Sequence, residues 1–162
     1  MATIISAVAI SQENSVAKAD DEISRREDKN SYLSNAPARV RAERDFLKSN
    51  TQATNIQWYE VPRGFLAYYK IQGNKGRSFY DRKGRFVYNI ISYNEQFLPR
   101  EVRIQVKSVY YLDYKITHVN EINHNSEPGK PIYLIQITNN KLWKKLKIAD
   151  GEMELLEEFA AQ

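Results

Sequence analysis

The sequence predicts an α+β fold, a tandem repeat of one helix plus a four-stranded antiparallel meander, with the helices packed on one face of the sheet. Two observations support this prediction. Each half closes with a glycine turn before its last strand-like stretch, at Gly84 and at Gly151. The same ten-residue spacing between a helix-like and a strand-like stretch also occurs twice, from Phe46 to Ile56 and from Val106 to Ile116.

The chain begins with a segment that resembles an export signal. Residues 2–11 form a short apolar run, well below the ~20 residues that a membrane span needs. Ala17 and Ala19 give a small-x-small cleavage pattern before an acidic stretch. We therefore expect a truncated signal peptide at 1–19, a flexible linker at 20–35 and two repeats at 36–95 and 96–162, with 36–162 forming one structural domain.

Two helices are predicted. A cap at Ser34 or Asn35 followed by Pro37 favours a first helix over about residues 37–50. Pro99 opens the second helix, over about residues 98–112. Its apolar stripe consists of Leu98, Val102, Val106, Val109 and Tyr110. Because such a stripe needs an apolar surface, we expect the helices to pack on the sheet.

Eight stretches have the strand-like alternation of apolar and polar residues. Asparagine and glycine turns separate several of them, as at residues 73–76 and 139–140. The last stretch has a helix-like composition, but it follows a hairpin turn, so we assign it as a strand. The predicted strands cover residues 56–59, 65–72, 77–81, 85–93, 115–124, 132–138, 141–148 and 152–159.

The apolar faces of these elements define a predicted core. Trp58 shares a strand face with Ile56, so we expect it to cap the core under the first helix. The predicted core contains Val40, Phe46, Ile56, Trp58, Ala67, Val102, Val106, Ile116, Leu134 and Leu146.

The composition excludes several functions. The chain has no cysteine, which excludes disulfides, thiolate catalysis and cysteine-based metal sites. Its 24 Lys and Arg residues are interleaved with 20 Asp and Glu residues, whereas nucleic-acid binding needs a concentrated basic stripe. The net charge of +4 therefore favours solubility more than nucleic-acid binding.

No residue pattern predicts a catalytic site, a metal site or a cofactor. The two histidines, His118 and His124, lie on one predicted strand, where about 20 Å separates them, too far to share a metal ion. No serine stands in a G-x-S-x-G motif. If the chain were an enzyme, the loop at residues 125–131 would be the place to look.

One predicted sheet face has the composition of a binding surface. Trp143 alternates with Leu142 and shares its face with lysines, so it is expected on the side of the sheet away from the helices. Aromatic and long cationic side chains on an open sheet suit partner recognition. The simpler alternative is that they cover a solvated face through cross-strand pairing. The candidate partner-binding residues are Leu66, Tyr68, Trp143, Lys145 and Lys147.

The stretch from Val40 to Phe159 resembles the beta-lactamase-inhibitor-like, PepSY-like family of small exported Bacteroidetes proteins. The residues that match are Phe46, Asn55–Trp58, Asp81–Gly84, Leu98, Pro99, Val102, Val106, Tyr114–Ile116, Asp150 and Gly151. The resemblance implies a two-repeat sheet with helices on one side and a periplasmic or surface location. It implies no catalytic residues.

We therefore expect a non-enzymatic exported binding module in the periplasm or outside the cell. Its open sheet face would recognise a protein or a cell-envelope component, and the mature chain would contain no membrane span. The alternative is a binder of nucleic acid or anionic glycan through a basic sheet surface, formed by Arg77, Arg82, Lys83, Arg85 and the strand at 141–147.

Overall fold

The structure is a computed structural model that describes residues 37–110 and 113–160. The expected signal peptide and linker lie outside the described residues. Residues 37–49 form a helix, here called the N-terminal helix, and α2 spans Arg100–Tyr110 after the short 3₁₀ helix η1, Glu95–Phe97. The strands are β1 Thr54–Val61, β2 Gly64–Ile71, β3 Asn74–Asp81, β4 Phe86–Tyr93, β5 Lys115–His124, β6 Ile132–Thr138, β7 Leu142–Ala149 and β8 Glu152–Ala160.

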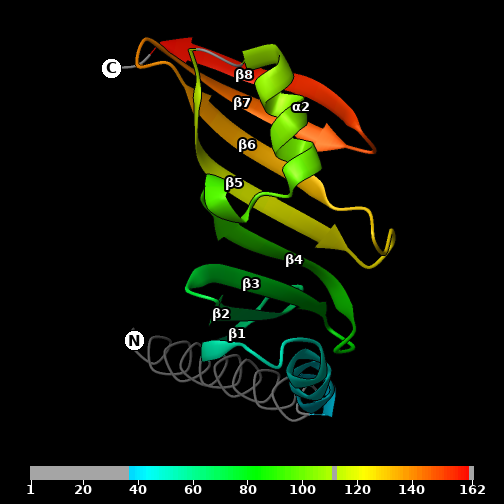
Figure 1. Ribbon diagram of the computed structural model, residues 1–162. Coiled ribbons are helices and arrows are strands. Elements are labelled where there is room, and N and C mark those ends of the chain that lie inside the picture. Colours follow the sequence, from blue (N-terminus) through cyan, green and yellow to red (C-terminus); the bar gives the residue numbers. More distant parts are fainter. Residues whose placement is uncertain (1–36, 111–112, 161–162) are drawn as a thin grey trace, which may run out of the picture.

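The eight strands form one continuous antiparallel sheet in the order β1 to β8 (Figure 1). The expected tandem repeat of one helix plus a four-stranded meander is therefore wrong. Strands β4 and β5, which it placed in different repeats, pair from Tyr88 with His124 to Tyr93 with Val119. The physical reason is that the unpaired backbone groups at the edge of β4 bond to β5 when the chain returns from α2.

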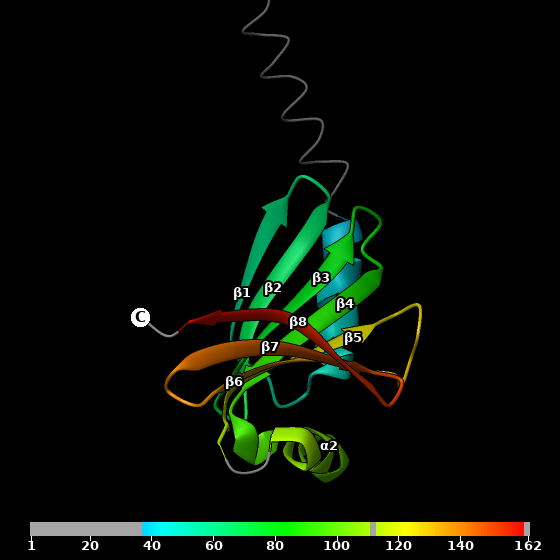
Figure 2. The same cartoon turned by 90° about the horizontal axis from the view of Figure 1, so that it is seen from above.

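Both helices lie on the same face of this sheet. The N-terminal helix buries Ala42 and Phe46 against β2 and β3, and α2 buries Val106 against the strands that follow it. The sheet twists so strongly that β1–β3 and β6–β8 run in crossed directions when the molecule is viewed from above (Figure 2). No described helix is both long and apolar enough to cross a membrane.

The buried apolar residues form two separate clusters. The aromatic cluster, under the N-terminal helix, consists of Ala42, Phe46, Phe65, Ala67, Tyr69 and Tyr80. The aliphatic cluster, under α2, consists of Tyr93, Leu98, Val106, Ile116, Val119, Tyr133, Ile135, Ile137, Leu146 and Ile148. The core is thus divided between the two ends of one sheet.

Most of the predicted core is confirmed. Phe46, Ala67, Val106, Ile116 and Leu146 are buried, and three further predicted residues, Ile56, Trp58 and Val102, are half-buried and pack against a cluster.

Two core predictions are wrong. Val40 is 51% exposed, because it lies two residues before Ala42 and so points to the opposite side of the helix. Leu134 is half-buried on the side of the sheet away from the helices, where it pairs with Lys147. Ile135, the next residue on β6, takes the core position.

The two outer strands each contain an irregularity. Pairing of β1 with β2 shifts register between Thr54 and Gln57, and Asn55 there has a positive φ of 53°. Pairing of β7 with β8 shifts between Lys145 and Leu146. A bulge of this kind bends and twists an outer strand.

A glycine positions the N-terminal helix on the sheet. Gly84, in the turn between β3 and β4, has a φ of +74°, and a Cβ there would collide with the backbone of Ala38. The adjacent Lys83 carbonyl accepts a hydrogen bond of 2.9 Å from Nη1 of Arg41. The turn therefore fits against the first part of the helix only without a side chain at position 84.

Candidate binding face

The side of the sheet away from the helices, here called the open face, carries a broad set of apolar side chains. The strand register places them next to one another across the sheet, for example Leu66 between Tyr59 and Phe79. Each is half-buried or exposed. They are Tyr59, Leu66, Tyr68, Phe79, Tyr88, Ile90, Ile122, Ile132, Leu134, Trp143 and Phe159. No described helix covers this side (Figures 1 and 2).

Aromatic rings on the open face are held against one another. Tyr59 and Tyr68 meet edge to face with their centroids 5.6 Å apart. Tyr88 lies 5.5 Å from Phe79 on one side and 5.7 Å from His124 on the other. Because these rings are fixed by their neighbours, they lose little conformational freedom when a partner covers them.

The predicted binding residues all lie on the open face but do not form one cluster. Leu66 and Tyr68 are on β2, whereas Trp143, Lys145 and Lys147 are on β7. Four strands lie between β2 and β7, so about 24 Å separates the two groups at the usual strand spacing. Only a partner as large as a folded domain, or two separate partners, could contact both groups.

The lysines of β7 are neutralised within the sheet. Nζ of Lys145 lies 3.1 Å from Oε1 of Glu157, and Nζ of Lys147 lies 3.7 Å from Oε2 of Glu154. Both glutamates belong to β8, directly across from the lysines. This end of the open face is therefore not the cationic surface that its sequence predicts. The sequence of β7 alone could not show this, because the partners come from a different strand.

The unneutralised cations lie at the other end of the open face. Lys70, Lys75 and Arg77 of β2 and β3 are exposed and form no ion pair with any described residue. Residues 37–93 contain eleven Lys and Arg against four Asp and Glu, whereas 94–110 and 113–160 contain nine against ten. A count by region would have found this asymmetry in the sequence.

The alternative basic surface is only partly free. Arg85 forms a 2.7 Å ion pair with Asp81, and Arg82 donates hydrogen bonds to the Pro62 carbonyl. Burial alone would raise the pKa of the Asp81 carboxyl, but hydrogen bonds from Arg85 and the Lys83 backbone outweigh it and lower the pKa. Arg82 and Arg85 therefore hold the β3–β4 turn in place.

The described residues contain no cluster of three metal-ligating side chains. His124, the last residue of β5, lies beside Tyr88 on the open face, and His118 lies on the same strand, paired with Gln136.

No protein-family model matches the chain, and no curated protein matches its sequence. Solved structures do match. A BLIP-like protein from Bacteroides fragilis is 18% identical with a TM-score of 0.58, and the match covers 75% of this chain and 84% of that one. A DUF2874 family protein from Bacteroides ovatus is 15% identical with a TM-score of 0.57, covering 74% and 85%.

A third match is a protein from Bacteroides eggerthii that is named as a "putative periplasmic" protein. It is 16% identical, with a TM-score of 0.56 and coverage of 74% of this chain and 86% of the other. None of these three names mentions PepSY. The fold of this chain is thus similar to that of BLIP-like and DUF2874 proteins of Bacteroides, and the resemblance to a beta-lactamase-inhibitor-like family of Bacteroidetes is confirmed at the level of the fold.

Proposed function

We propose that this chain is a non-enzymatic exported binding module whose open face binds a folded protein with an acidic surface. The supporting observation is the set of eleven half-buried or exposed apolar side chains that extends across all eight strands on the side that no described helix covers. Continuous apolar surfaces of this size on soluble proteins mark interaction sites. Lys70, Lys75 and Arg77, which form no ion pair with a described residue, give the β2–β3 end of the face a charge that an acidic partner would complement.

The dimensions of the face suit a protein partner. Eight strands at the usual spacing are about 34 Å across, and strands of eight residues are about 26 Å long. The resulting area of roughly 900 Å² is close to the ~800 Å² that each partner contributes to a standard protein–protein interface. A small ligand would leave most of this surface uncovered.

The proposed export rests on the apolar N-terminal run and on the name of the Bacteroides eggerthii protein. Cleavage would follow Ala19, and N-terminal sequencing of protein purified from the native cell tests it. Protein that begins at Asp20 in the periplasmic or extracellular fraction supports export. An intact Met1 in the cytoplasmic fraction contradicts it.

The binding proposal is tested by affinity capture from an extract of the native cell envelope, with quantitative mass spectrometry. We expect a partner that the wild-type chain captures and the double variant Tyr68→Ala/Trp143→Ala does not. The matched control is Val109→Ala, because Val109 is 61% exposed on α2, on the helical side of the molecule. Equal capture of every protein by all three chains would contradict a role for the open face.

Binding of a polyanion is the second candidate, supported by the excess of cations in residues 37–93. Because phosphate binding releases counterions, the affinity for a single-stranded DNA or heparin probe would fall steeply between low and high salt. Arg77→Glu would weaken it further. No binding of either probe at low salt would exclude this candidate and leave the protein partner.

A further inference from the structure

A row of polar side chains interrupts the helical side of the sheet. Ser78, Asn89 and Asn123 lie side by side on β3, β4 and β5, since Ser78 pairs with Asn89 and Asn89 pairs with Asn123. The aromatic and aliphatic clusters lie on either side of this row. Positions that face the helices are normally apolar, because they form the core. Three polar side chains in a row there suggest a function other than core packing.

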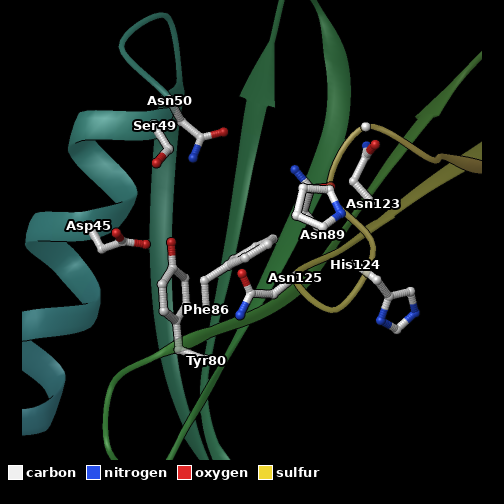
Figure 3. Close-up of a pocket in the computed structure, with 11 residues that line it drawn as sticks. Asp45, Ser49, Asn50, Tyr80, Phe86, Asn89, Asn123, His124 and Asn125 are labelled. Carbon is white, nitrogen blue, oxygen red and sulfur yellow. The ribbon is translucent and has the colours of Figure 1, made fainter.

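A cavity of about 430 Å³ is lined by two residues of this row, Asn89 and Asn123. Its walls come from the end of the N-terminal helix, from β3 and β4, and from the loop after β5 (Figure 3). A volume of this size is typical of sites for small molecules. Amide groups are the most frequent lining, contributed by Asn50, Asn89, Asn123 and Asn125.

The amide groups of the cavity keep both donors and acceptors for a ligand. Nδ2 of Asn50 donates to the Phe46 carbonyl at 3.1 Å, and Nδ2 of Asn123 donates to Oε1 of Glu121 at 3.1 Å, so each of these NH2 groups uses one of its two N–H bonds. The side chain of Asn89 bonds the hydroxyl of Tyr69, whereas its buried Oδ1 has no partner in the described chain. A ligand that fits must therefore both donate and accept hydrogen bonds.

The charged residues that line the cavity favour a neutral ligand over an anion or a cation. None of the described residues that line it is a lysine or an arginine, so they offer no cationic counter-charge of that kind to a phosphate or a carboxylate. Its one carboxylate, Asp45, faces the hydroxyl of Tyr80 (Figure 3). Burial and this carboxylate raise the pKa of Tyr80, so the phenol stays protonated and hydrogen-bonds to Asp45. An organic cation would have to compete with that hydrogen bond.

We propose that this cavity binds one sugar residue or a comparable neutral polyhydroxyl compound. Sugar hydroxyls would donate to amide oxygens and accept from amide N–H groups of the asparagines that line the cavity, and the ring of Phe86, which also lines it, offers an apolar surface for the C–H face of the sugar. The cavity lies on the helical side of the sheet. His124 borders both the cavity and the open face, but a sugar in the cavity would leave the apolar side chains of the open face uncovered.

Side-chain amide signals in ¹H–¹⁵N NMR spectra test this proposal directly. Glucose and N-acetylglucosamine serve as free-sugar probes, and the β1,4-linked dimer and tetramer of N-acetylglucosamine represent a glycan. We expect saturable shifts at the side chains of Asn89, Asn123 and Asn125, with dissociation constants of about 1 mM for a single sugar. The internal control is Asn139, which lies in the β6–β7 turn. Tighter binding of the dimer or tetramer identifies a glycan as the source.

Variants then assign the shifts to the cavity. Asn123→Ala and Asn125→Ala should each weaken binding about fivefold, the ratio that corresponds to one hydrogen bond of about 1 kcal/mol. Asn125 is in an exposed loop, so its variant tests the site even if Asn123→Ala unfolds the protein. The matched control is Asn120→Ala, on the opposite face of the same strand. Absence of saturable shifts with every sugar, or equal binding by the Asn125 and Asn120 variants, would overturn the proposal.

Discussion

The two clusters of the core differ in how their burial is distributed. Four of the six buried residues in the aromatic cluster are Phe or Tyr, whereas eight of the ten in the aliphatic cluster are Leu, Ile or Val. In the aromatic cluster, the ring of Phe46 meets Tyr69 at 4.9 Å and Trp58 at 5.6 Å. One ring therefore connects the N-terminal helix to two strands, whereas α2 buries only the smaller Val106, with Val102 and Tyr110 half-buried beside it.

The stability of the aromatic cluster is therefore expected to depend more on single residues than the stability of the aliphatic cluster does. Large aromatic side chains bury more area each and add edge-to-face attraction. A cluster built from a few of them loses a larger share of its contacts when one is removed.

The largest effect is expected from a charge placed in the aliphatic cluster. Val106→Asp would bury a carboxylate without a partner and should destabilise the fold by roughly 4 kcal/mol or more, because Val106 is 1% exposed. Urea denaturation followed by circular dichroism measures this loss. Val109→Asp, on the exposed side of the same helix, is the control and should remain close to wild type. Equal stability of both variants would mean that α2 does not pack as described.

Phe46→Ala should cost about 3–5 kcal/mol, since it removes a fully buried ring and leaves a cavity. Leu47→Ala is the matched control, because Leu47 is 58% exposed on the next position of the helix. Val106→Ala, the corresponding truncation under α2, should cost less than Phe46→Ala. If the two truncations cost the same, the contrast between the clusters would be lost.

Alkaline pH should weaken both clusters. Burial raises the pKa of Tyr69 and Tyr80 in one cluster and of Tyr93 and Tyr133 in the other above the ordinary 10.0. The unfolded chain therefore loses these protons first. The contribution of the protonated tyrosines to the free energy of unfolding is therefore complete below pH 10. Above pH 10 it falls by up to about 1.4 kcal/mol per pH unit for each tyrosine. Urea midpoints between pH 7 and 11 measure the fall.

Tyr93 permits a check within the aliphatic cluster. Its hydroxyl donates a 2.7 Å hydrogen bond to Oε2 of Glu121, and this carboxylate adds to burial in raising the pKa. Tyr93→Phe removes the titrating group and should give a shallower decline of stability above pH 10. If the stability of this variant fell as steeply as that of the wild type above pH 10, groups other than Tyr93 would cause the alkaline loss of stability.

The smallest effect is expected from the lysines of β7. Lys145→Ala breaks an ion pair with Glu157 at the surface and should cost less than about 1 kcal/mol. Lys75→Ala, on β3, breaks no ion pair with a described residue and should leave stability unchanged. Thermal melting at low and high salt measures both, and only the Lys145 effect should shrink as salt rises. A larger effect of Lys75→Ala would show that the charges at the β2–β3 end stabilise the fold.

The sequence predicted what depends on neighbouring residues in the chain. Alternation identified Ala67, Ile116 and Leu146 as inward-facing, and helical spacing identified Val106. It failed where two faces had similar composition: Val40 was assigned to the wrong side of its helix, and Leu134 was chosen where Ile135 is buried.

Features created by distant pairing could not be predicted. The hydrogen bonds between β4 and β5 join segments separated by α2, so the continuous sheet cannot be read from either half. The same pairing brings Asn89 next to Asn123 and creates the floor of the cavity. The neutralisation of Lys145 and Lys147 likewise depends on β8, a strand whose composition favours a helix.

The irregular outer strands have a consequence for behaviour at high concentration. An open sheet exposes unsatisfied backbone groups at β1 and β8, and such strands can template the stacking of many copies into fibrils. The register shifts in β1 and β8 prevent a second copy from forming a long regular ladder there. The irregular strands at the two ends of the sheet therefore oppose edge-to-edge stacking of copies at β1 and β8.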